Sequence, residues 1–213
     1  MTIFDQTDLQ ELDKIKRLNL VNSCTGFKSA NLIATVSPEG IPNLAVFSSV
    51  THLGSNPAML GFILRPTTVP RHTYSNLKTC PYFTVNHISS SIIDKAHQTS
   101  ANYEAGISEF DAVGLTPHFI ENCEVPFVAE SKVQLLCKYL NEYPIHENDT
   151  IHIIAKIEKI IVAEESFLTN DMWLNLEKAD SVAINGLDAY AQPKILDRFS
   201  YARVGKDLSS LDF

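Results

Sequence analysis

The chain has 213 residues, of which 45% are hydrophobic and 20% are charged, and its formal net charge is −8. These values are typical of a globular protein, and they exclude a disordered chain, a collagen-like repeat and a coiled coil. The excess of acidic residues also argues against a nucleic acid or an anionic membrane as the main partner.

The cysteines and the first residues indicate where the protein works. Cys24, Cys80, Cys123 and Cys137 lie too far apart for a CxxC metal or redox motif, so we expect reduced thiols. The start, MTIFDQTDLQELDKIK, lacks the basic and apolar regions of a signal peptide. No apolar run approaches the ~20 residues of a membrane span. We therefore expect a cytoplasmic protein with no membrane partner.

In chain order, the first element is a charged segment over residues 1–28. Its apolar residues Leu9, Leu12, Ile15 and Leu18 recur every three positions, which predicts an amphipathic helical arm. The sequence then changes to short β-branched runs, and the turn Ser37–Gly40 joins the first two as a hairpin. Strands are expected over Ala30–Ser37, Pro42–Val50, Ala58–Leu64, Pro81–Ile88, Lys132–Leu140 and Thr150–Ala163.

Two short helices are predicted between these strands. One covers Val69–Thr79, with Thr67 and Thr68 as caps and Pro70 in the first turn, and the other follows Ser91 and ends near Gln98. Residues 101–126 are expected to be irregular, with a later helix near Asp171–Ala179 and a loop-rich tail over residues 180–213. The pattern predicts one domain over residues 1–213, mainly β with helical insertions, folded as a closed or nearly closed antiparallel barrel.

One segment of this acidic chain contains no carboxylate. Between Gly40 and Ile93 there is no Asp or Glu, although the average composition predicts about six. Buried strands avoid all charge, which accounts for part of this depletion. The segment nevertheless keeps three cations and three histidines, which suits a bound anion of the size of a phosphate. They are Arg65, Arg71, Lys78, His52, His72 and His87.

Two motifs within this segment are candidate binding elements. Arg65–Thr73 places two arginines and three threonines at the start of a predicted helix, where free N–H groups and arginine forks favour phosphate. The alternative is a solvated turn before a capped helix. Asn43–Ser49 ends a strand in two hydroxyls, which can face a planar hydrogen-bonding ligand or simply enter a turn.

Other chemistry finds little support in the sequence. There is no G-x-G-x-x-G, P-loop, G-x-S-x-G or H-E-x-x-H motif. His146, Glu147 and Asp149, with His152 nearby, match no zinc spacing and are interpreted as a solvated loop. Glu109 and Asp111 do not form a convincing acid–base pair.

Several motifs resemble those of the flavin reductase-like, FMN-binding split-barrel family. Asn43–Ser49 is similar to the N-x-A-P-F-S strand of that family, with Val46 in place of proline. Arg71–Leu77 resembles its K-D-T-x-x-N-I segment, and the exchanges at Arg71 and His72 keep or increase positive charge. Further matches follow in order at residues 81–89, 107–117, 128–137 and 186–203.

The resemblance implies an antiparallel FMN-binding split β-barrel that forms a homodimer, with FMN near the subunit interface. Ser48 and Ser49 would then lie by the isoalloxazine or ribityl chain. Arg65, Arg71 and Thr73 would hold the phosphate. The residues expected beside the ring or the nicotinamide are Asn86, His97, Thr99 and Ser100.

The resemblance further implies an NAD(P)H-dependent flavin reductase, which transfers hydride from nicotinamide to flavin N5. Such chemistry needs orientation more than a protein acid or base, because the cofactor supplies the reactivity. Two alternatives stay open: an FMN-bearing electron carrier or reductase of another small acceptor, and a non-catalytic ligand-binding or interaction barrel. Arg71, Thr73 and Ser48 argue against the non-catalytic barrel. Nothing in the sequence separates the other two hypotheses or selects NADH over NADPH.

Overall fold

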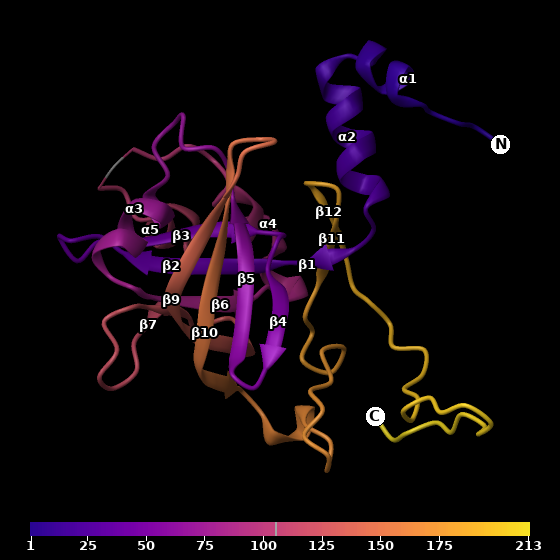
Figure 1. Ribbon diagram of the computed structural model, residues 1–213. Helices are drawn as coiled ribbons and strands as arrows, with labels where there is room; N and C mark the ends of the chain where they lie inside the picture. The colour runs from indigo at the N-terminus through magenta and orange to yellow at the C-terminus, as the bar shows by residue number, and fades with distance from the viewer. Residues whose placement is uncertain (105) are drawn as a thin grey trace.

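The structure is a computed structural model that describes residues 1–104 and 106–213, and its centre is one strongly curved sheet (Figure 1). Its seven strands hydrogen-bond in the order β3-β2-β6-β9-β10-β5-β4, and each neighbouring pair is antiparallel. The prediction of a mainly β, antiparallel fold is therefore confirmed. The strands are β2 Asn31–Val36, β3 Pro42–Phe47, β4 Thr51–Ser55, β5 Ala58–Leu64, β6 Tyr82–His87, β9 Val133–Ile145 and β10 Thr150–Val162.

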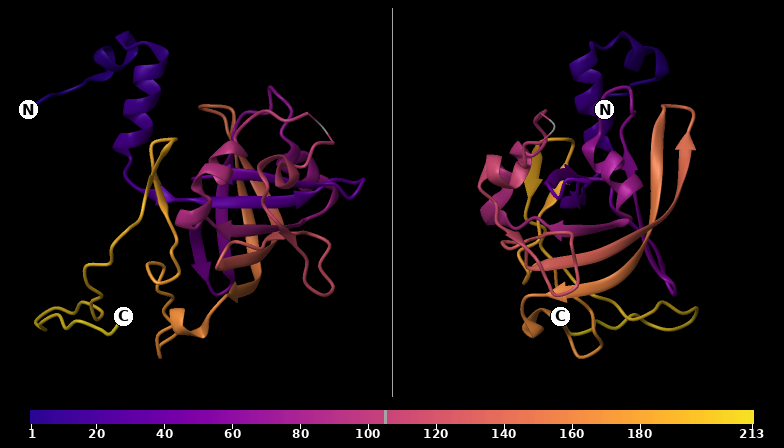
Figure 2. Two further views of the ribbon diagram at one scale, coloured as in Figure 1. Left: turned by 180° about the vertical axis from the view of Figure 1, so that it is seen from behind. Right: turned by 90° about the vertical axis from the view of Figure 1, so that its left-hand side faces the viewer.

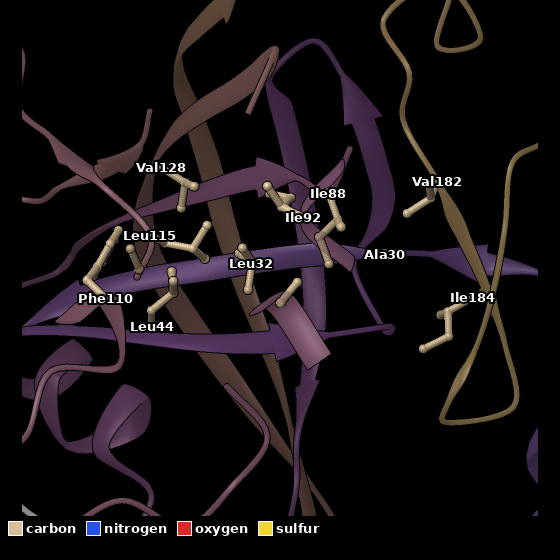
Figure 3. Packing of buried hydrophobic residues seen from close by; sticks show 12 residues of the cluster. Ala30, Leu32, Leu44, Ile88, Ile92, Phe110, Leu115, Val128, Val182 and Ile184 are labelled. Atoms are coloured by element: carbon tan, nitrogen blue, oxygen red, sulfur yellow. The ribbon is translucent and has the colours of Figure 1, made fainter. Parts of the chain in front are cut away.

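Alternate residues of the central strands enter two separate hydrophobic clusters. Ile33 of β2 packs with Phe83 of the neighbouring β6 and with Phe62 of β5, which lies several strands away in the sheet, so this cluster fills the barrel interior. The neighbouring Leu32 and Leu44 face the other side (Figure 3). Because both faces of β2 and β6 are covered, charge is excluded from them, which explains part of the acid-free segment.

The curved sheet closes through a side chain at the end of β3. Ser49 Oγ accepts a hydrogen bond from the backbone N–H of Ile63 in β5 at 3.0 Å and donates to its carbonyl at 3.3 Å. Among the described residues no strand ladder joins β3 to β5. The barrel is therefore split along this line, and the two sheet edges stay largely open.

Short helices cover the end and the outside of the barrel. α3 (His72–Thr79) sends Leu77 into the interior cluster. Ala96 of α4 and Phe110 of α5 pack in the outer cluster against β3. The remaining short elements are η1 Ser90–Ile92, α4 Ile93–Gln98, α5 Glu109–Val113, β7 Pro117–His118, β8 Phe127–Val128 and η2 Glu165–Phe167.

The predicted helix over Val69–Thr79 begins later than expected. Its N-cap is Arg71, which has an extended backbone and makes no side-chain capping hydrogen bond. Thr67 and Thr68 lie in an exposed turn and are not caps. Pro70 disfavours helical dihedrals at the preceding residue, so the helix cannot extend back through this loop.

The predicted helix near Asp171–Ala179 is wrong, because this segment consists of turns and a single bridge between Leu168 and Leu174. Thr169 Oγ1 accepts from the N–H of Trp173 and donates to its carbonyl, both at 3.1 Å. Those backbone groups are consequently withdrawn from a helical pattern. Met172 also has a φ of 65°, a left-handed conformation that interrupts an α-helix.

The N-terminal arm and the C-terminal segment extend from the barrel (Figure 2). The expected arm forms two helices, α1 (Gln6–Glu11) and α2 (Lys14–Cys24), because Asp13 caps a new helix with its side chain. Neither helix contains a buried residue. A three-stranded sheet links arm and tail: β1 Lys28–Ser29, β11 Ala183–Asn185 and β12 Ala189–Ala191.

Among the helices that the structure describes, none is long and apolar enough to cross a bilayer.

His87 lies at the end of β6, where the barrel meets the C-terminal segment. Its Nδ1 is 3.1 Å from the hydroxyl of Ser181. Burial lowers the pKa of this imidazole from 6.5 to about 4, because the charged form would lose its hydration. The native protein therefore holds His87 neutral at pH values where the unfolded chain protonates it.

This difference predicts a loss of stability in mild acid. Stability linked to His87 is complete above its unfolded pKa and falls as the pH drops toward the native value. Between about pH 7.5 and about pH 5, urea unfolding should show that the wild type loses ~2 kcal/mol more than His87→Gln. His146→Gln, at an exposed turn position, is the control and should follow the wild type. Parallel curves for wild type and His87→Gln would contradict the prediction.

Candidate functional site

The two serines expected beside a planar ligand lie just beyond the end of β3, and they differ in their contacts. Ser49 uses its hydroxyl as both donor and acceptor to close the barrel at Ile63. Ser48 is part-buried, and its side chain makes no hydrogen bond to the described residues. Ser48 is consequently the one with a hydroxyl available to a ligand, whereas Ser49 shapes the strand end.

The start of α3 is a strong candidate for an anion site. Arg71 Nε donates to the carbonyl of Pro66 at 3.2 Å, which fixes the side chain over the loop. Neither Arg71 nor Arg65 forms an ion pair within the described residues. The first-turn amides of His72, Thr73 and Tyr74 also find no acceptor among them. Two available cations and three free N–H groups together favour a phosphate.

A buried polar network attaches this helix start to the sheet. Asn43 Nδ2 on β3 donates to Thr73 Oγ1 at 3.2 Å and to Thr35 Oγ1 at 3.3 Å. Asn76 Nδ2 reaches the same Thr35 oxygen at 3.0 Å. Thr73 is only 5% exposed, so its side chain is held in this interior contact at the start of α3. The network fixes where the first turn of α3 lies relative to β3.

The outer edge of β3 offers backbone groups to a ligand. The N–H of Leu44 points away from β2 and donates to Glu109 Oε2 at 2.8 Å. Because hydrogen-bonding direction alternates along an antiparallel strand, the N–H groups of Val46 and Ser48 point to the same side. β3 is an edge strand of the described sheet, so this row lies open beyond Leu44.

Glu109, which the sequence indicated only within a motif, contacts the outer edge of β3. Its side chain is buried at the start of α5, and desolvation raises the pKa of its carboxyl while the bond from Leu44 opposes that shift. In the sequence, the available signal for Glu109 was its place within the motif over residues 107–117. Glu109 holds α5 on the open edge of β3 and is not half of an acid–base pair.

The remaining predicted residues fall into two groups. Asn86 is fully buried: it donates to Leu32 and Thr84 and accepts from Val128, so its amide is satisfied by the core. Thr99 is 3% exposed and donates to the carbonyl of Ala96 at the end of α4.

Both residues therefore have structural roles, and the interior position of Asn86 does not suit contact with a flavin ring.

His97 and Ser100 are exposed at the end of α4. His97 Nδ1 is 3.3 Å from the hydroxyl of Tyr190 in β12, and the two rings meet edge to face. No hydrogen bond in the described structure links these two residues to Ser48 or to the start of α3. They stay available for a ligand that spans both regions.

The Glu109 contact predicts opposite effects for two substitutions. Glu109→Leu leaves the Leu44 N–H buried without an acceptor and should cost about 1–3 kcal/mol of unfolding free energy. Glu109→Gln retains an acceptor and removes the titration. Because the pKa of Glu109 is raised in the native state, its ionisation destabilises the wild type as the pH rises through that pKa. The stability of the Glu109→Gln variant relative to wild type should therefore grow from about pH 5 to about pH 7.5.

Denaturant unfolding measures both effects, with the exposed Glu104→Gln as the control. A pH-independent difference between Glu109→Gln and wild type would show that the carboxyl does not titrate abnormally. An unchanged stability in Glu109→Leu would show that the hydrogen bond from Leu44 to Glu109 does not stabilise the fold.

Comparisons with known proteins agree with this architecture. A solved structure of a protein with a split barrel domain from Shewanella frigidimarina NCIMB 400 is 39% identical, with a TM-score of 0.91 over 95% of this chain and 100% of that one. Nitrilotriacetate monooxygenase component B from Bacillus cereus shares the fold at 20% identity, with a TM-score of 0.79 over 92% and 96% of the two chains. An FMN-binding protein from Thermus thermophilus does so at 15% identity, with a TM-score of 0.65 over 80% and 89%.

These likenesses confirm the split-barrel fold. A family model described as the flavin reductase like domain matches residues 25–171, which is most of the chain. This protein therefore belongs to the flavin reductase like family.

Proposed function

We propose that the protein binds FMN and reduces it, or a further small acceptor, with hydride from NADH or NADPH. The observation that carries the proposal is the start of α3, where Arg71 and three free amides have no carboxylate partner in the described structure and Arg65 lies in the preceding loop. Family membership and the FMN-binding relative from Thermus thermophilus support the choice of a flavin.

The arrangement of the residues suits a flavin held along the split. Arg65, Arg71 and the first-turn amides of α3 would bind the phosphate. Ser48 and the outward N–H groups of β3 would hydrogen-bond the polar edge of the ring, and Glu109 would keep that edge in place. When bound, FMN supplies the hydride-accepting centre, and the protein orients it and excludes water. His97 and Ser100 would border the nicotinamide side.

Absorption spectroscopy tests the proposal directly. The purified protein should carry, or acquire on titration, the visible absorption of oxidised flavin. Anaerobic NADH or NADPH should then bleach that band, and the faster donor would be the natural one. Flavin binding without bleaching would favour the electron carrier. Absence of binding at micromolar FMN would favour the non-catalytic barrel.

Arg71 gives the sharpest test of the phosphate site. Arg71→Ala removes a charge-assisted hydrogen bond worth about 1.5–3 kcal/mol, so FMN affinity should fall roughly 10- to 150-fold. Riboflavin has no phosphate, so its weaker binding should change little. Arg71→Lys should lose less than Arg71→Ala, because the charge remains although the fork is lost.

Fluorescence titrations with FMN and riboflavin measure these affinities. Lys159→Ala, which removes an exposed cation far along the chain on β10, is the control for net charge. Equal losses of affinity for FMN and for riboflavin would show that Arg71 does not bind the phosphate.

We further propose a homodimer. Arm and tail leave apolar side chains in solvent that a second copy can cover: Ile15 is 62% exposed, Val21 44% and Phe199 56%. The arm itself has no buried residue, so contacts within one chain do not account for its order.

Sedimentation at micromolar concentration should give the mass of two chains. Ile15→Glu should shift the equilibrium toward the monomer by placing a charge in the interface. A monomeric wild type would contradict the proposal.

The proposed location is a reducing cytoplasm. All four cysteines are free thiols, and burial raises the pKa of the Cys137 thiol to about 12, which makes it unreactive.

A further inference from the structure

A half-enclosed cavity of about 350 Å³ lies between the barrel and the C-terminal segment. Its floor includes Asn31 at the start of β2 and His87 at the end of β6. The rest of its wall is mostly apolar, with Phe27, Trp173, Leu176 and Ile195 among its residues. The volume is at the lower end of the range for small-molecule sites, and such walls favour apolar ligands.

One polar group in the lining of this cavity lacks a hydrogen-bond partner in the described structure. Asn31 is 1% exposed, and its Nδ2 has no hydrogen-bond partner among the described residues. The low pKa of His87 keeps the imidazole uncharged at neutral pH. The charged groups at the rim are already engaged: Lys28 Nζ donates to the carbonyl of Asn22 at 2.7 Å, and Glu177 Oε2 accepts from Ile195 at 2.8 Å.

The cavity is distinct from the start of α3 in position and chemistry. Trp173, Leu176 and Ile195 lie after residue 171, where the family match ends. The charged residues in its lining, Lys28 and Glu177, have opposite signs, so the cavity offers a phosphate no net positive charge. A buried amide without a partner costs free energy, which a ligand acceptor would recover when the amide rotates toward it.

We propose that this cavity is a binding site for a small uncharged aromatic molecule with one hydrogen-bond acceptor, such as an aromatic ketone. The ring lies against Trp173 and the aliphatic walls, and the acceptor takes the N–H of Asn31. The ligand does not depend on a bound flavin. Asn31 pairs with Phe47 of β3, so the site adjoins the strand end that carries Ser48.

Trp173 is the only tryptophan of the chain, so its fluorescence reports on the cavity directly. The probe is acetophenone, titrated into the full-length protein with and without saturating FMN. Ethylbenzene, which has nearly the same shape and no acceptor, is the matched competitor and should displace it only weakly. We expect saturable quenching in both conditions.

Asn31→Leu removes the donor and keeps the volume. Acetophenone affinity should then fall about 3- to 10-fold, the value of one neutral hydrogen bond, while ethylbenzene is unaffected. Asn102→Leu, at an exposed position, is the control. If Asn31→Leu does not fold, Leu176→Glu places a charge at the 39%-exposed mouth residue and should weaken both ligands.

Three results would overturn the proposal. Absence of saturable quenching would exclude the ligand. Loss of quenching in saturating FMN would assign the cavity to the flavin itself. Quenching that appears only on dilution to the monomer would show that a second copy fills it. Because the titration needs neither FMN nor NAD(P)H, its failure is distinguishable from failure of the proposed reductase activity.

Discussion

The open edges of the curved sheet are the constraint on which the rest of the structure depends. A barrel hydrogen-bonds its first strand to its last, but in the described structure β3 and β4 share no ladder, and the side chain of Ser49 reaches across to Ile63 of β5. The backbone of β3 is consequently left with outward N–H groups, which would pair with another strand if they stayed exposed. Glu109 occupies the first of them. In the proposed function, the row beyond it is where a planar ligand would take the place of the missing strand.

The same constraint explains the distribution of charge. Of the three cations in the acid-free segment, Lys78 has a partner, because Glu142 lies 2.6 Å away and Tyr139 and Tyr74 complete the cluster. That carboxylate comes from β9, outside the acid-free segment. Arg65 and Arg71 have no such partner in the described structure, and Arg71 is the N-cap residue beside the free amides of α3. A carboxylate near them would neutralise the charge that a phosphate needs.

Much of the fold follows from the sequence because strand periodicity is a local property. The predicted bounds of β5 match the structure, those of β2 and β6 differ by one residue at each end, and those of β10 differ by one residue at the C-terminal end. β4 was not predicted, since Thr51–Ser55 is an edge strand with mostly exposed residues and no apolar alternation. The helix predicted near Asp171–Ala179 does not form, because the side chain of Thr169 hydrogen-bonds the backbone N–H and carbonyl of Trp173.

The site was less predictable, because a polar residue type does not show whether its partner is protein or ligand. Asn86 and Thr99 carry the same groups as a binding residue, but the core already satisfies them. Glu109 shows the converse, since its spacing from Asp111 suggested no chemistry while its burial against β3 gives it a role. Only the hydrogen bonds in the folded structure distinguish a polar side chain that the core satisfies from one that is free to bind a ligand.

The C-terminal segment shows how an extension can add a surface to a family domain. Residues beyond 171 have few regular hydrogen bonds of their own, so they need anchors. Arg198 supplies one by stacking 4.8 Å from the centre of the Trp173 ring and pairing with Asp171. These two contacts hold the Trp173 ring in place as the cavity wall opposite the barrel. The resulting cavity is therefore a consequence of how the extension is held, and a ligand bound there would in turn stabilise the segment against the barrel.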